Sequence, residues 1–129
     1  MTTSSERTRL IRPSDRRRET VQTPGMEREE AVRTTSMWAG IAKTAGNTFS
    51  GWHHHGAYES MIHVLRGRVR LEFGRGGAEV IEAVAGDSLY VAPGEVHREG
   101  NPGEDESEIV VVRGGSGEVV VNVPGPSTG

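Results

Sequence analysis

Short apolar or alternating segments, separated by glycine-rich turns, constrain the fold of this chain most strongly. From Met26 onward they recur as MEREEAV, SMWAGIAKT, ESMIHVL, RVRLEF, AEVIEAV, SLYVA, SEIVVV and EVVVNV. In RVRLEF, apolar and charged residues alternate, which is typical of a strand with one buried face and one wet face. Eighteen glycines suit many tight turns, and no segment keeps helical spacing of apolar residues for three turns. The pattern predicts an all-β sandwich or barrel.

The length of 129 residues fits one domain, flanked by two short terminal segments. Residues 1–24 carry six arginines, three acidic residues and almost no large apolar residues, so we expect a disordered or extended arm without secondary structure. Acidic residues among the arginines, and the lack of aromatic residues for stacking, argue against a nucleic-acid-binding arm. We place the barrel at residues 25–122 and a C-terminal tail at 123–129.

Charge and composition exclude several kinds of partner. The net charge of −3 argues against general binding of nucleic acid. The chain has no cysteine, so a metal would be held by nitrogen and oxygen ligands alone. No apolar run approaches the roughly 20 residues that a membrane helix needs, and MTTSSERTRL is no secretion signal. We therefore expect a cytoplasmic protein that binds a small molecule.

Three consecutive histidines in GWHHHGAYES supply the first candidate metal ligands. Residues two apart in a strand project to the same face, so His53 and His55 can point together while His54 points away. Glu59, which follows a short glycine-containing link, is a candidate third ligand. His97 lies far along the chain, directly after a turn predicted at Pro93 and Gly94, and only a closed barrel would bring it to the other three.

These residues resemble the two sequence motifs of the cupin superfamily. His53, His55 and Glu59 match its HxHxxxE pattern, and the second motif is matched at Gly86, Gly94, His97 and Asn101. The proline of the second motif is displaced by one position, to Pro93. One extra residue lies between Glu59 and Gly67, and we expect a bulge to absorb it.

The resemblance implies a fold and a metal centre. The fold would be a double-stranded β-helix, the jelly-roll barrel of a small single-domain cupin. The centre would hold one divalent transition metal per chain on His53, His55, Glu59 and His97. Imidazole and carboxylate suit Fe, Mn, Ni, Cu or Zn, so the residue types leave the ion open.

His63 is a candidate catalytic acid or base. If it is in phase with Glu59 it would face the pocket, where an imidazole can exchange protons near neutral pH. The rival interpretation is a polar residue between strands or at a subunit contact.

We expect a metal-dependent enzyme that acts on a small organic molecule in bacterial secondary or catabolic metabolism, and the resemblance to cupins implies a reaction of dioxygenase type. The alternatives are a cupin that binds a small molecule or metal without turnover, and a non-redox cupin: an isomerase, a lyase, a cyclase or a zinc enzyme that joins two nitrogen atoms. Exposed strand edges and the charged segment 26–32 predict a homodimer.

Overall fold

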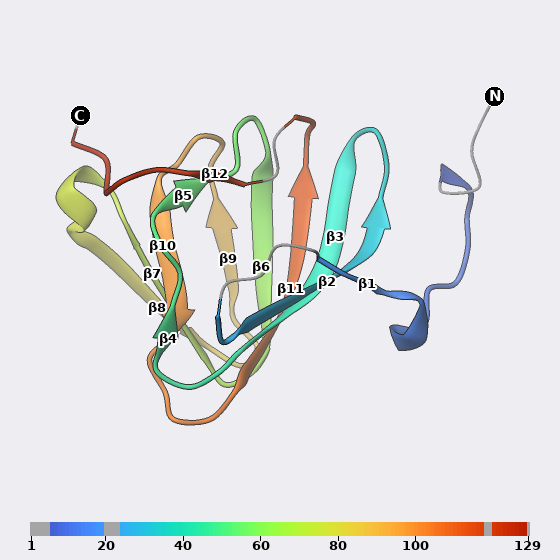
Figure 1. Ribbon diagram of the computed structural model, residues 1–129, viewed down its shortest axis with the longest axis horizontal. Helices are drawn as coiled ribbons and strands as arrows, with labels where there is room; N and C mark the ends of the chain where they lie inside the picture. Colours follow the sequence, from blue (N-terminus) through green and yellow to red (C-terminus); the bar gives the residue numbers. More distant parts are fainter. Residues whose placement is uncertain (1–5, 20–23, 118–119, 129) are drawn as a thin grey trace.

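Two antiparallel sheets face each other across a single apolar core in the computed structural model, which describes residues 6–19, 24–117 and 120–128 (Figure 1). The fold is a jelly-roll barrel, as predicted. Its strands are β1 (Arg17–Arg18), β2 (Met26–Arg33), β3 (Met37–Thr44), β4 (Thr48–Phe49), β5 (His53–His54), β6 (Glu59–Arg66), β7 (Arg68–Phe73), β8 (Glu79–Val84), β9 (Ser88–Val91), β10 (His97–Asn101), β11 (Ser107–Gly114) and β12 (Val121–Asn122).

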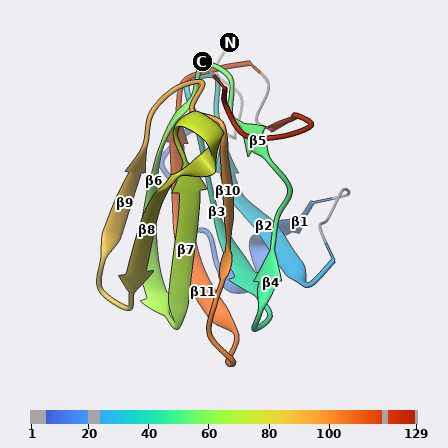
Figure 2. The ribbon, with the colours of Figure 1, turned by 90° about the vertical axis from the view of Figure 1, so that its left-hand side faces the viewer.

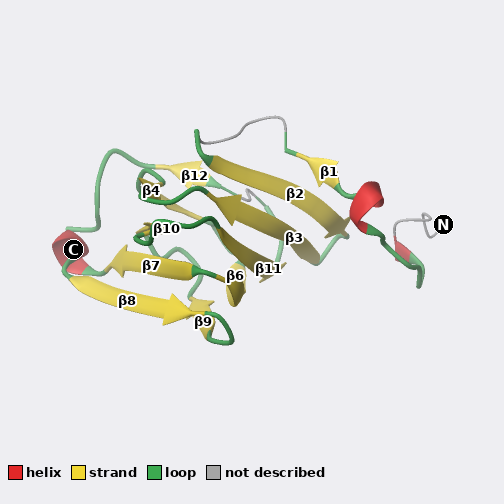
Figure 3. Ribbon diagram, turned by 90° about the horizontal axis from the view of Figure 1, so that it is seen from below, coloured by secondary structure: helices red, strands yellow, loops and turns green. Residues whose placement is uncertain are grey.

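Strands distant in the sequence are neighbours in each sheet. The first sheet has the order β1-β2-β3-β11-β6-β9, and the second has the order β12-β5-β10-β7-β8, with β4 also paired to β10. Seen from below, the sheets form two layers (Figure 3). Because β5 and β10 pair, the histidine-rich segment and the second half of the chain meet in one sheet.

Period-two alternation places the core between the sheets. Buried and less buried residues alternate along β3 and β11, as expected for strands with one face inside. The core consists of Trp38, Ala42, Ile62, Val64, Val69, Leu71, Ala83, Leu89, Val91, Ile109 and Val111. In RVRLEF the inward residues are those predicted, with Val69 and Leu71 buried and Phe73 packed against the cluster.

The extra residue after Glu59 is absorbed in β6, as predicted. Val64 pairs with Ile109 and Arg66 pairs with Glu108, so Leu65 is left over between two successive partners on β11. Gly67 then ends the strand with φ +81°, a conformation that glycine adopts without steric cost. A glycine-rich turn follows β7, as a 3₁₀ turn over Arg75–Gly77 flanked by Gly74.

The arm is extended but carries secondary structure where none was expected. A 3₁₀ turn spans Pro13–Asp15, and β1 adds an edge strand by pairing Arg17 and Arg18 with Glu30 and Glu29 of β2. Ion pairs from Arg16 to Glu29 (3.0 Å) and from Arg18 to Glu27 (3.3 Å) attach the arm to β2. The composition of the arm alone does not reveal these contacts. Residues 1–5 and 20–23 of the predicted arm lie outside the described residues.

Candidate metal centre

The pairing of β5 with β10 brings the two histidine segments together. Strand β5 lies beside β10 (Figure 2). In this register His53 is directly opposite His97. The predicted turn before His97 is present: the Glu95 amide donates to the Ala92 carbonyl across Pro93 and Gly94 (3.2 Å). The Gly94 amide in turn donates to the carbonyl of Gly56 (2.8 Å), so this turn is tied to the loop that follows the three histidines.

The motif residue Asn101 closes the other end of β10. It is fully buried, and its side-chain amide donates to the carbonyls of Thr44 (3.1 Å) and Asp105 (2.6 Å). Its side-chain oxygen accepts from the Gly103 amide (2.9 Å). Asn101 therefore shapes the loop after β10 and fixes the position of the strand that carries His97.

Three imidazoles and one carboxylate converge inside the barrel. His53, His55, His97 and Glu99 each offer one donor atom, and these four atoms lie within 4.8 Å of one another. Nε2 of His53 and Nε2 of His97 lie 3.6 Å and 4.0 Å from the same Glu99 oxygen. The three rings are 4.4 to 5.1 Å apart between centroids. All three histidines are buried, so the cluster lies in the interior.

Backbone carbonyls fix the tautomer of two histidines. Nδ1 of His53 is 2.9 Å from the Gly51 carbonyl, and Nδ1 of His97 is 2.9 Å from the Glu95 carbonyl. A carbonyl can only accept, so each Nδ1 carries the proton and each Nε2 keeps a free lone pair. Such outer hydrogen bonds orient imidazole ligands in metal sites.

The protonation states of His97 and Glu99 are those of metal ligands. Burial lowers the pKa of His97 more strongly than the Glu99 carboxylate raises it, so the ring is neutral at pH 7. Burial opposes ionisation of Glu99, but the contact with the His53 side chain holds its pKa below the usual range. A neutral imidazole and an ionised carboxylate are the forms that bind a divalent cation.

The donor set fits a divalent transition metal. Metal–ligand bonds of about 2.0–2.2 Å place ligands of one ion roughly 3–4 Å apart, close to the spacing of this cluster. Nε2 of His97 is buried and has no hydrogen-bond partner among the described residues. Such an atom costs about 1–3 kcal/mol when left unsatisfied, and a metal would satisfy it. His53, His55, His97 and Glu99 are therefore the residues that would hold the ion.

Glu59, predicted as a ligand, lies outside this cluster. It is exposed at the start of β6, where its carboxylate accepts a hydrogen bond from the Tyr90 hydroxyl (2.9 Å). The cause is the turn after His55, in which the Tyr58 amide donates to the His55 carbonyl (3.0 Å). Tyr58 is then buried, and β6 begins with Glu59 outward and Ser60 inward.

His63 and His54 also lie outside the cluster. His63 is in phase with Glu59, as predicted, but that phase is the outer face of the sheet, where Nδ1 of His63 contacts the Ser88 hydroxyl (2.9 Å). The bulge comes after His63 and does not change its side. His54 points away from its neighbours, as expected for the middle residue of three, and its Nδ1 accepts from the Gly56 amide (3.0 Å).

Sequence reasoning missed Glu99. The signal is the HRE segment at 97–99, in which His97 and Glu99 are two residues apart on one strand. The period-two argument that pairs His53 with His55 applies equally here. Outward-pointing Arg98 separates the two, with its guanidinium over the rings of Phe49 and Trp52.

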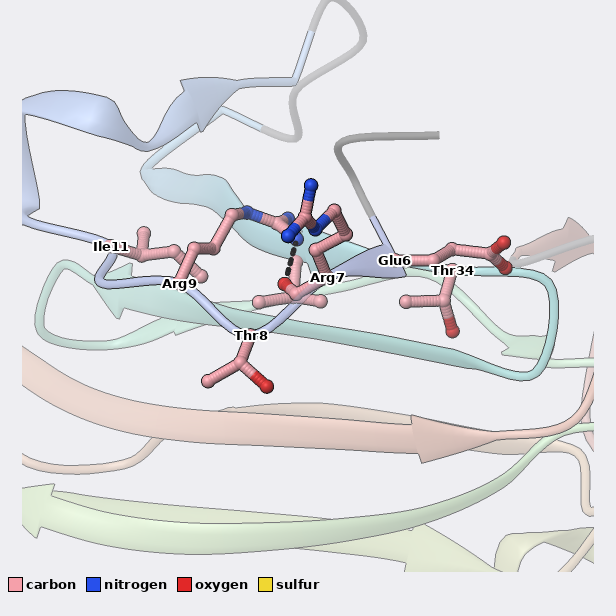
Figure 4. Close-up of a pocket in the computed structure, with 7 residues that line it drawn as sticks. Glu6, Arg7, Thr8, Arg9, Ile11 and Thr34 are labelled. Carbon is pink, nitrogen blue, oxygen red and sulfur yellow. Dashed lines mark hydrogen bonds between the residues drawn. The ribbon is translucent and has the colours of Figure 1, made fainter. Parts of the chain in front are cut away.

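A separate groove lies between the arm and the first sheet (Figure 4). It is lined by Glu6, Arg7, Thr8, Arg9, Ile11, Val32 and Thr34. The Arg9 guanidinium donates to the Arg7 carbonyl across it (3.3 Å). The groove shares no lining residue with the histidine cluster and contains no imidazole, so it offers no comparable metal ligands.

None of the described residues belongs to a helix long and apolar enough to cross a membrane.

Comparison with known proteins identifies the family. The cupin domain model matches residues 41–113, more than half of the chain, and the protein belongs to the cupin family. No curated protein sequence is matched. Among solved structures, KdgF from Halomonas sp. is 17% identical with a TM-score of 0.71, covering 86% of this chain and 96% of its own.

Two further structures share the fold. The polyketide cyclase RemF from Streptomyces resistomycificus is 20% identical, with a TM-score of 0.70 and coverage of 91% of this chain and 86% of its own. The Mn(II)-containing oxalate decarboxylase of Bacillus subtilis is 15% identical with a TM-score of 0.70, covering 80% of this chain and 29% of its own. At such low identity these similarities establish the barrel fold alone, and the reaction has to be inferred from the residues of the site.

Proposed function

We propose that this cupin is a metal-dependent enzyme that acts on a small organic molecule, with dioxygenase-type oxidation as its reaction. The observation that carries the proposal is the convergence of four buried donors, His53, His55, His97 and Glu99, with the lone pair of His97 Nε2 unused. A bound divalent metal would supply a Lewis acid and, if redox-active, a centre for activating dioxygen.

The chain contributes an ordered and dry set of ligands. The carbonyls of Gly51 and Glu95 hold two imidazoles in the binding tautomer before any ion arrives. Burial excludes water from the rings, which strengthens electrostatic interactions at the centre. Four protein ligands leave up to two positions of a six-coordinate ion for substrate, water or dioxygen. This preparation is what an enzyme or a selective metal-dependent binder requires.

The reaction type is tested by loading the purified protein with Fe(II), Mn(II) or Ni(II) and incubating each form with a metabolite extract. We expect oxygen consumption matched by new products in mass spectra, and neither with the His97→Ala variant. Products formed without oxygen consumption would replace the dioxygenase with a non-redox cupin, such as a cyclase or lyase. Bound metabolite without any product from any metal form would contradict an enzyme and support a binding protein.

We also propose that the protein is bacterial, is located in the cytoplasm and forms a homodimer. Part of the edge predicted for pairing is already used, because β1 pairs with Glu29 and Glu30 of β2. The outer face of β6 and β9 instead exposes Met61, Leu65 and Tyr90, which a second copy would cover. We expect a dimer by light scattering at micromolar concentration, and a monomer for Met61→Glu. A wild-type monomer would contradict the dimer.

A further inference from the structure

A buried arginine shares the barrel interior with the histidine cluster. Arg113 is the last inward residue of β11, following Ser107, Ile109 and Val111, and only 4% of its surface is exposed. Its register partners are Ser60 on β6 and Trp38 on β3, both buried as well. The Arg113 guanidinium lies over the Trp38 ring, 4.6 Å from its centroid. A charged group is thus held in an interior wall of the barrel that also contains the buried hydroxyl residues Ser60 and Ser107.

Two polar atoms of this wall have no hydrogen-bond partner among the described residues. Nε of Arg113 and the hydroxyl of Ser60 are buried and without a hydrogen bond among the described residues. No described carboxylate forms an ion pair with Arg113, whereas the other arginines with an unsatisfied buried Nε, Arg16 and Arg98, are paired with Glu29 and Glu72. Buried charges are normally paired, so Arg113 and Ser60 are prepared for a ligand that is not part of the chain.

This wall is close to the metal centre. The charge of Arg113 interacts with the Glu99 carboxylate and with His97 of the cluster, and also with Arg28 and Glu19, whose opposite charges offset each other. At the same end of the barrel, β11 ends, β6 begins and β5 carries His53 (Figure 1). Burial lowers the pKa of Arg113 to about 10, with Glu99 partly opposing this, so the guanidinium stays charged at neutral pH. One ligand could therefore contact both the arginine and the centre.

We propose that Arg113 and Ser60 bind a carboxylate group of the substrate, next to the metal centre formed by His53, His55, His97 and Glu99. This inference rests on the proposed function, because it names the class of substrate that would bind at the proposed metal centre. A guanidinium presents two parallel N–H donors that match the two oxygens of a carboxylate, and the Ser60 hydroxyl adds a third donor.

Charge favours a singly charged group over phosphate. With a divalent metal and Glu99 at the centre, Arg113 leaves the interior with a net charge of about +2, which a substrate with two singly charged carboxylates, such as malonate, would neutralise. Glu99 in the same space disfavours a second negative charge on the group bound by Arg113. The preferred substrate is therefore a small carboxylic acid with a second oxygen that can reach the metal.

The test measures malonate binding by calorimetry, with neutral malonamide and inorganic phosphate as comparison ligands. Each is titrated into Ni(II)-loaded and metal-free wild-type protein and into Arg113→Gln, Arg113→Lys and Ser60→Ala. Arg75→Gln, which removes an exposed arginine, is the charge-matched control. We expect malonate affinity to fall about 10- to 100-fold in Arg113→Gln, with a smaller loss in Arg113→Lys and Ser60→Ala. Malonamide binding and Ni(II) content should not change.

Several outcomes would overturn the anion site. They are unchanged malonate affinity in a folded, Ni(II)-containing Arg113→Gln protein, an equal loss of malonamide affinity, phosphate binding as tight as malonate, or no malonate binding to wild-type protein. The metal proposal fails separately: if Ni(II) does not bind but malonate binding to metal-free protein still requires Arg113, the anion site stands alone. If Ni(II) binds but malonate affinity does not depend on Arg113, only the proposed anion site is contradicted.

Discussion

Arg113→Met is expected to stabilise the metal-free protein at neutral pH by on the order of 1–2 kcal/mol. The wild-type side chain keeps a charge in the interior without an ion pair among the described residues, and burial lowers its pKa to about 10. Methionine removes that charge and keeps an apolar chain over Trp38, at the cost of the cation–π contact. Thermal unfolding of EDTA-treated protein should show Tm raised by about 3–8 °C.

The pH dependence of this gain has a defined sign. A base whose pKa is lowered in the folded state destabilises the fold while it stays charged. For Arg113 this loss of folding stability is fully present below about pH 10, and it disappears as the pH rises toward the ordinary pKa of arginine. The gain in Arg113→Met should therefore be equal at about pH 6 and 8. Arg75→Met, on an exposed turn, should change stability by less than about 0.5 kcal/mol. A clear loss of stability in Arg113→Met would show that Arg113 has a structural role.

His97→Ala is expected to lower metal affinity by on the order of 100-fold or more. The variant removes a fully buried donor from the centre of the cluster, and each ligand carries a large share of the binding free energy. Competition titration of Ni(II) or Zn(II) against a chelator measures the change directly.

Two matched controls separate ligand loss from general damage in the His97→Ala experiment. His54→Ala and His63→Ala each remove an imidazole outside the cluster, so both should bind metal within about threefold of wild type. An equal loss of affinity in His54→Ala or His63→Ala would contradict the assignment of ligands. Retained affinity in a folded His97→Ala protein would do the same.

Sequence periodicity predicted an all-β sandwich or barrel, and the resemblance to the cupin motifs supplied the jelly-roll form and three of the four residues in the cluster. His53 lies in β5 and His55 directly after it, and the turn at Pro93 and Gly94 precedes His97, which lies opposite His53, so all three histidines meet in the cluster. The alternation in RVRLEF and the bulge before Gly67 could be read in the same way.

The fourth member of the cluster depended on a turn that motif spacing does not determine. The hydrogen bond from Tyr58 to His55 tightens the loop by enough to turn Glu59 outward, and Glu99 takes the inward position from the opposite strand. The buried arginine was also not predicted, because Arg113 follows an unbroken apolar run and only the register with Ser60 and Trp38 shows it to be inside.

The most direct measurement of the central claim compares metal content after dialysis for wild type, Glu99→Gln and Glu59→Gln. Each variant exchanges a carboxylate for an amide of the same shape, so only the ligand chemistry changes. The inward carboxylate predicts one metal per chain in wild type and Glu59→Gln, and a strongly reduced content in Glu99→Gln. Full metal content in Glu99→Gln together with loss in Glu59→Gln would contradict the centre described here.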